Sequence, residues 1–169
     1  EFERRYVGSR VLYAAKAFMN LSLTRLVKDE GLGMDVVSGG ELAAAKTAGF
    51  PLSLVYFHGN NKTAQEIQMA MDLGVGRIVV DNFHELALLQ EIAQAQGTVQ
   101  KAMLRVSPSV DPHTHTHTTT GILDSKFGFS METGDAAHAI RQALTAPNID
   151  LTGLHFHLGS PIFELEPYS

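Results

Sequence analysis

Short apolar runs alternate with amphipathic stretches along this 169-residue chain. The apolar runs have the length of strands and lie at 10–15, 34–38, 52–57, 77–81, 101–107 and 151–159. The stretches between them are predicted as helices at 19–31, 39–49, 61–74, 82–97 and 133–147, and a longer polar segment occupies 108–130. Strands that are apolar on both faces, each followed by a helical crossover, are typical of parallel β/α units.

The spacing of these units favours a (β/α)8 barrel, in which active residues cluster at the carboxyl ends of the strands. A dinucleotide-binding sheet is less favoured, because no Gly-x-Gly-x-x-Gly pattern follows the first strand. Six strands cannot close a barrel of eight. We therefore expect residues 1–169 to form an incomplete barrel of about six β/α units, which is either truncated or completed by another chain. Both ends of the sequence read as cut.

The composition argues against several classes of protein. The formal charge is -5 and the pI is about 5.9, whereas a nucleic-acid-binding domain is usually basic. Without cysteine the chain has no disulfide and no thiolate metal site, which fits a reducing compartment. No apolar run reaches the roughly 18 residues of a membrane span, and the N-terminus lacks the apolar core of a signal peptide. We expect a cytoplasmic protein that binds neither nucleic acid nor membrane.

Polar residues recur where the predicted strands end, and in a barrel these ends meet at one mouth. They are Lys16, Asp35, Ser38, Gly39, His58, Gly59, Asn60, Lys62, Asp81, Asn82, Arg105, His155, His157, Gly159 and Ser160. Each has a simpler explanation when taken singly, since a strand-end Asp often caps the next helix. Their recurrence after nearly every strand is what indicates a site.

Lys16, in "YAAKAF", is the most informative of these residues. A lysine in an apolar pocket has its charged form disfavoured, and a free amine can bond to an aldehyde such as that of pyridoxal phosphate (PLP). His157 could then stack on the cofactor ring, and Gly159 with Ser160 could donate to its phosphate. The alternative is a lysine whose stem packs in the wall while its amine reaches solvent at the rim.

Six motifs occur in order along the chain: "YAAKAF", "GMDVVSGGEL", "FHGNNKT", "RIVVDN", "DPHTHTHTTTGILDSKFGF" and "GLHFHLGSPI". With these motifs, residues 6–163 resemble the barrel region of diaminopimelate decarboxylases, which are PLP enzymes of the alanine racemase-like fold. The "HTH" followed by "TTGILDSKFGF" is the feature most specific to this branch.

The resemblance implies roles for individual residues. Lys16 and His157 would be catalytic, the first holding PLP covalently and the second stacked on its ring. Asp35 would lie in the active-site wall near the lysine, and Arg105 near the phenolic oxygen of the cofactor. The phosphate would be bound by Gly159 and Ser160. Residues expected to line the same mouth are His58, Asn60 and His155; the two histidines 155 and 157 share one strand face by the period-two rule.

The resemblance also implies an activity: decarboxylation of meso-diaminopimelate to L-lysine and CO2 by a homodimer. The family's glycine-rich phosphate loop, its glutamate paired with the pyridine nitrogen and its C-terminal β domain have no counterpart in these 169 residues, so we expect the chain alone to be inactive. Two alternatives stay open: a non-catalytic truncated relative that binds PLP or a partner chain, and a related basic amino-acid decarboxylase.

The "HTHTHT" stretch offers a competing interpretation. In an extended segment His113, His115 and His117 share one face, and three imidazoles can bind zinc or nickel. The simpler interpretation is a solvated loop that shapes the approach to the active site. Because no acidic partner or fixed geometry is evident, we expect no dedicated metal site.

Overall fold

The computed structural model describes residues 1–108 and 127–159. Within these ranges it has seven strands, six α-helices and two short 3-10 helices, η1 (Ala15–Ala17) and η2 (Leu52–Leu54). The chain divides into two units, Glu1–Val79 and Val80–Ser169. We call them the first and the second unit and describe each by itself.

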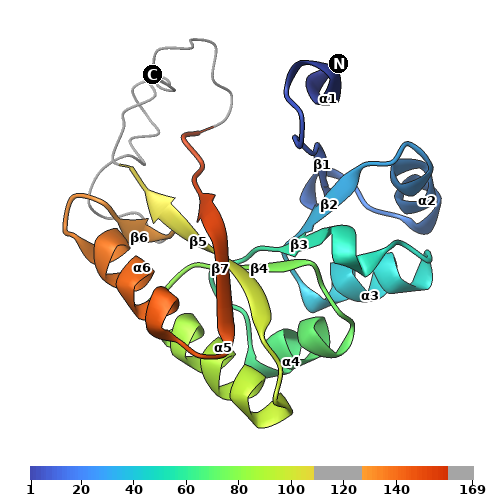
Figure 1. Cartoon of the computed structure of the whole chain (residues 1–169). Helices are drawn as coiled ribbons and strands as arrows, with labels where there is room; N and C mark the ends of the chain where they lie inside the picture. The colour runs from blue at the N-terminus through green and yellow to red at the C-terminus, as the bar shows by residue number, and fades with distance from the viewer. Residues whose placement is uncertain (109–126, 160–169) are drawn as a thin grey trace, which may run out of the picture. The chain divides into compact units, whose positions relative to one another are not determined.

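The first unit is built from four strands that are parallel in sequence order (Figure 1). They are β1 (Leu12–Ala14), β2 (Gly33–Val36), β3 (Val55–Phe57) and β4 (Arg77–Val80), the last running one residue past the boundary of the unit. The helices are α1 (Phe2–Arg5), α2 (Leu21–Asp29), α3 (Gly39–Thr47) and α4 (Ala64–Asp72). The sequence missed α1, and it predicted a strand over 52–57 where Pro51 instead starts the turn η2.

The strands of the first unit are buried on both faces, as the sequence predicted. Met34, Val36, Val55, Phe57 and Ile78 are all fully buried. A side chain such as that of Phe57 contributes about 1.5–3 kcal/mol when fully buried. In β4 the successive residues Ile78, Val79 and Val80 are buried, which distinguishes a sheet covered on both sides from an antiparallel sheet with one solvated face. Asp35 of β2 and Tyr56 of β3 are half-buried between buried neighbours.

Helices begin directly after the strands because polar residues cap their first turns. Asn20, Ser38, Thr63 and Asn82 each accept a hydrogen bond from the backbone N–H three residues later. At α4 the cap is reciprocal, since Glu66 also accepts from the backbone N–H of Thr63 at 3.0 Å. Asparagine, serine and threonine are among the residues that are preferred at this position.

The second unit centres on β5 (Gln100–Ser107), which pairs in parallel with β6 (Phe129–Ser130) and with β7 (Ile149–His155) (Figure 1). Its helices are α5 (Phe83–Gln96) and α6 (Asp135–Thr145). The two-residue β6 lies within the segment that the sequence treated as irregular. The last strand ends at His155, whereas the sequence predicted a strand as far as 159.

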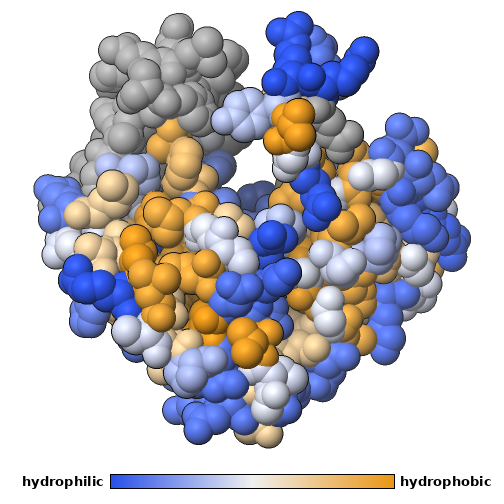
Figure 2. Space-filling view, in the orientation of Figure 1, coloured by the Kyte–Doolittle hydropathy of each residue, from blue (hydrophilic) through white to orange (hydrophobic). Residues whose placement is uncertain are grey.

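Several large apolar side chains stay exposed in the second unit. Leu154 is 47% and Phe156 is 51% exposed, at and just beyond the end of β7, and Leu144 at the end of α6 is 68% exposed. Figure 2 shows apolar residues gathered on the face where β7 lies.

Among the residues that the structure describes, no helix is long and apolar enough to cross a membrane.

The predicted fold class is confirmed at the level of its units. In both units parallel strands alternate with helices, which is the arrangement of a partial (β/α) barrel. In this arrangement functional residues are expected at the carboxyl ends of the strands.

Candidate active site

Lys16 lies in η1, immediately after β1. The strand was predicted to run to residue 15 but ends at Ala14, and the turn that follows is closed by a hydrogen bond of 2.8 Å from the Tyr13 hydroxyl to the Phe18 carbonyl. Ala15 is buried, whereas the side chain of Lys16 is exposed. The described residues therefore do not enclose this amine in the apolar pocket that the sequence suggested, although its place at a strand end is as expected.

Asp35 and His58 form a pair in the first unit. The register of the sheet places Asp35 beside Ala14 of β1 and beside Tyr56 of β3. His58, directly after β3, has its Nε2 atom 3.6 Å from Oδ1 of Asp35. The His58 side chain is 10% exposed and that of Asp35 is 25% exposed. A carboxylate and an imidazole thus lie together one strand away from the turn that carries Lys16.

The loop after β3 contains a buried lysine whose role the sequence did not reveal. The Nζ atom of Lys62 donates to the carbonyl of Gly59 at 2.6 Å and to that of Val79 at 2.9 Å. It also lies 5.5 Å from the centre of the Phe57 ring. These contacts connect the loop after β3 to the end of β4, so Lys62 stabilises the loop. Asn60 in the same loop is half-buried.

In the second unit, Arg105 of β5 is the central charged residue. Its Nη1 atom lies 3.6 Å from Oδ1 of Asp81, which follows β4 and is 3% exposed. The guanidinium carbon lies 4.4 Å from the centre of the Phe127 ring. The sheet register pairs Arg105 with His155 of β7, and paired residues of neighbouring parallel strands point to the same face. Arg105 and His155 therefore share a face of this sheet.

The histidine pair is arranged differently from the prediction. His155 is the last residue of β7 and is half-buried, whereas His157 follows the strand and is exposed. The period-two rule holds inside a strand, so it does not place His157 on the face of His155. Gly159 lies two residues further on with φ 144°, and Ser160 lies outside the described residues.

The site residues fall into both units. The first unit brings Asp35 and His58 together near the turn of Lys16, and the second brings Asp81, Arg105 and His155 together. That all of them meet at a single mouth stays a prediction, as do their individual roles. The strand-end rule found most of these positions; the side-chain partners of Arg105 and Lys62 had no signal in the sequence.

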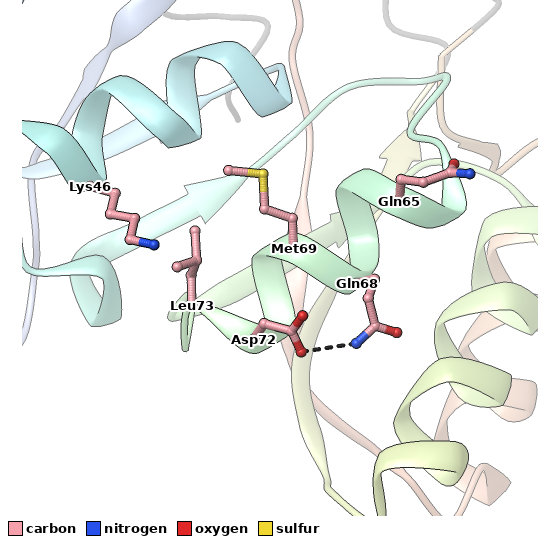
Figure 3. Close-up of a pocket in the computed structure, with 6 residues that line it drawn as sticks. All are labelled: Lys46, Gln65, Gln68, Met69, Asp72 and Leu73. Carbon is pink, nitrogen blue, oxygen red and sulfur yellow. Dashed lines mark hydrogen bonds between the residues drawn. The ribbon is translucent and has the colours of Figure 1, made fainter.

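A pocket of about 370 Å³ lies between α3 and α4 and is lined by Lys46, Gln65, Gln68, Met69, Asp72 and Leu73. In Figure 3, Met69 of α4 and Leu73, which follows α4, point toward α3, and Gln68 donates to Asp72 at 2.9 Å. None of the strand-end residues lines this pocket. The described residues contain no group of three potential metal ligands, and His113, His115 and His117 lie outside them.

The whole chain matches one family of known proteins. All of residues 1–169 match the family model described as "Pyridoxal-dependent decarboxylase, pyridoxal binding domain". The chain therefore belongs to this family, whose cofactor is the one that the sequence predicted.

Within the family, the resemblance to diaminopimelate decarboxylases is confirmed. The chain is 47% identical over 156 residues to the diaminopimelate decarboxylase of Bacillus subtilis (strain 168), a match that covers 92% of this chain and 36% of the relative. It is 44% identical over 163 residues to that of Bacillus methanolicus, covering 96% of this chain and 38% of the relative. The chain thus spans a little over a third of the length of these curated relatives.

Solved structures show the same similarity to diaminopimelate decarboxylases. The crystal structure of diaminopimelate decarboxylase from M. jannaschii matches with a TM-score of 0.88 and 38% identity, over 99% of this chain and 39% of that chain. The enzyme from Helicobacter pylori, complexed with L-lysine, matches with a TM-score of 0.87 and 32% identity, over 98% of this chain and 42% of that chain. These similarities confirm the partial barrel.

Proposed function

We propose that the complete protein that contains this chain is a PLP-dependent diaminopimelate decarboxylase, which acts as a cytoplasmic homodimer and converts meso-diaminopimelate to L-lysine and CO2. The observation that carries the proposal is the family match over the whole chain, combined with a lysine at the carboxyl end of β1. The relatives named above supply the substrate class.

The residues present fit the cofactor. An exposed amine, Lys16, is available for an aldehyde. A carboxylate and an imidazole, Asp35 and His58, lie at the neighbouring strand ends, and the guanidinium of Arg105 is a cation suited to a phenolate or phosphate oxygen. An amine for the aldehyde and a guanidinium for an anionic oxygen are among the groups that suit a phosphorylated pyridine aldehyde.

In this proposal Lys16 would hold the cofactor covalently through its Nζ atom. Bound PLP supplies the electron sink for the electron pair that CO2 leaves behind. Asp35, held by His58, provides negative charge near the amine of Lys16. Arg105 would bind the phenolic oxygen of the cofactor, and His157 would cover its ring and keep water from it.

The other predicted site residues have supporting roles in the same proposal. Gly159 and Ser160 bind the phosphate. His155 lines the site beside Arg105, in keeping with their paired register, and Asn60 lines it from the loop after β3.

The test uses the complete protein. We expect CO2 release from meso-diaminopimelate and, after borohydride reduction, a pyridoxyl label on the peptide that contains Lys16. Lys16→Ala should abolish both. Lys46→Ala, which removes an exposed lysine of α3, is the matched control and should retain both.

Other outcomes would decide between the alternatives. A label on Lys62 or Lys126 in place of Lys16 would refute the assignment of the lysine. Bound cofactor without CO2 release would favour a non-catalytic PLP-binding relative. CO2 release from L-lysine or L-ornithine but not from diaminopimelate would favour a related basic amino-acid decarboxylase.

A further inference from the structure

A buried carboxylate and an aromatic ring fix the guanidinium of Arg105 within the second unit. Asp81 lies 3.6 Å from Nη1, and the ring of Phe127 lies 4.4 Å from the guanidinium carbon. The side chains of Asp81 and Arg105 are only 3% and 16% exposed. Three segments that are far apart in the sequence, at 81, 105 and 127, therefore meet at one cation.

Asp81 is itself held in place by two backbone contacts. Its Oδ2 atom accepts a hydrogen bond of 3.1 Å from the backbone N–H of Gly128. Its own N–H donates to Oε2 of Glu85 in the first turn of α5, at 3.3 Å. The backbone of Asp81 is thus fixed by the helix that follows it, and its carboxylate is fixed by the segment that approaches Arg105.

Gly128 lets that segment come so close. Its φ is +76°, and a Cβ atom there would lie 2.7 Å from the carbonyl oxygen and 3.1 Å from Cγ of Arg105. Only a residue without a side chain accepts both the backbone angle and the approach. The contact between Phe127 and the guanidinium therefore depends on a glycine at this position.

This arrangement does more than neutralise a charge. A guanidinium has five N–H donors in a rigid planar fork, so holding one edge against a carboxylate and one face against a ring fixes where the remaining donors point. Since Arg105 is paired in register with His155, those donors belong to the sheet face that also carries a predicted active-site histidine.

We propose that Asp81 is a positioning residue, which together with Phe127 sets the direction of the Arg105 guanidinium toward an anionic oxygen of the pyridoxal cofactor. This inference rests on the proposed function, because it takes the cofactor as the group that Arg105 meets. A role in stability alone is the competing explanation, since removing one partner of a buried ion pair is destabilising by itself.

The experiment compares Asp81→Asn with Asp135→Asn in the complete protein. Asparagine keeps the shape and the acceptor for Gly128 but removes the charge. The control removes a carboxylate of α6 that accepts from the Thr133 hydroxyl. Three quantities are measured: the dissociation constant of PLP, the pH midpoint of the visible absorption band of the bound cofactor, and the rate at which phenylglyoxal labels Arg105 in the cofactor-free protein.

For Asp81→Asn we expect a dissociation constant raised by about tenfold or more, as for a lost charge-assisted contact. We also expect a shifted pH midpoint and several-fold faster labelling of Arg105. The control variant should leave all three at the wild-type value. Should Asp81→Asn not fold, Phe127→Leu, which removes the ring but no charge, should change the same quantities in the same direction by a few-fold.

Two results would overturn the inference, and they differ from each other. If the wild-type protein holds cofactor but the Asp81 and Phe127 variants only lower the melting temperature, leaving the midpoint and the labelling rate unchanged, Asp81 is structural. If the wild-type protein takes up no cofactor at all, the proposed function fails first and the positioning role toward a cofactor fails with it.

Discussion

One carboxylate, that of Glu66, accepts hydrogen bonds from backbone N–H groups at the N-termini of two helices in the first unit. Its removal should destabilise both helices. Oε2 accepts from the backbone N–H of Thr63 at 3.0 Å and from the Thr63 hydroxyl at 2.9 Å. Oε1 accepts from the backbone N–H of Gly39, the first residue of α3, at 2.9 Å. The bond to Gly39 spans 27 residues, so Glu66 connects α3 to α4 as well as capping α4.

The expected loss of stability follows from the groups that lose a hydrogen-bond partner when Glu66 is replaced. A helix cap contributes about 1 kcal/mol, and a hydrogen bond to a charged group about 1.5–3 kcal/mol when it is buried. Glu66 is partly exposed, so water replaces some of what is lost. We therefore expect Glu66→Ala to lower the free energy of unfolding by about 2 kcal/mol, and Glu66→Gln by about half of that because its amide oxygen still accepts.

The effect should depend on pH. The backbone N–H of Thr63, followed by that of Gly39, holds the pKa of Glu66 below its ordinary value. A folded-state pKa below the unfolded one gives stability that is fully present above the unfolded pKa, about 4.3 for Glu, and is lost as the pH falls through the folded pKa. The difference in stability between wild type and Glu66→Gln should therefore shrink as the pH drops below about 4.3.

Urea unfolding of the complete protein at a series of pH values measures these differences. Glu91→Gln, which alters an exposed carboxylate of α5, is the control and should change stability by less than about 0.5 kcal/mol. The reasoning is refuted if Glu66→Ala costs no more than this control, or if the loss for Glu66→Gln is the same at pH 7 and at the lowest pH at which the protein stays folded.

Two further predictions concern the loops at the strand ends. His157→Ala in the complete protein should weaken PLP binding by about three- to tenfold and slow turnover, with a smaller effect for His155→Ala; equal losses, measured by dialysis and absorbance, would show that the pair is wrongly assigned. Gly59→Ala should destabilise the protein by about 2 kcal/mol, because φ there is +114° and the added Cβ would lie 3.1 Å from the carbonyl of Val37. Gly74→Ala, at φ +67° with no atom nearby, should cost less in the same unfolding assay, and an equal cost would contradict the argument from close approach.

The sequence predicted the features of this chain that have a period or a local signal. Alternation of apolar runs and helical stretches marked the parallel units. Strand-end polarity located Asp35, His58 and Arg105. Each of these signals lies within a few residues of what it predicts, which is why it can be read without a structure.

Contacts between distant segments could not be predicted in the same way. The link from Lys62 to Val79 spans 17 residues and the bond from Gly128 to Asp81 spans 47. Such partners depend on the register of the strands and on the paths of the loops, and neither produces a periodic pattern in the sequence. The sequence also did not predict that Lys16 is exposed or that β7 ends before His157. The reason is related, because a short apolar run extends past the last hydrogen-bonded residue of the strand.

The acidic residues at the strand ends divide into two sets with different uses. Carboxylates at the third position of a helix accept from backbone N–H groups, as Glu41 does from Val37 at 2.7 Å, and Glu66 and Glu85 do likewise. Because glutamates fill these positions, the aspartates of the strand ends are left for side-chain partners. Asp35 pairs with His58, and Asp81 pairs with Arg105. Short β-to-α connections put both sets at the same end of the strands, so helix capping and the candidate site use the same edge of each sheet without competing for the same carboxylates.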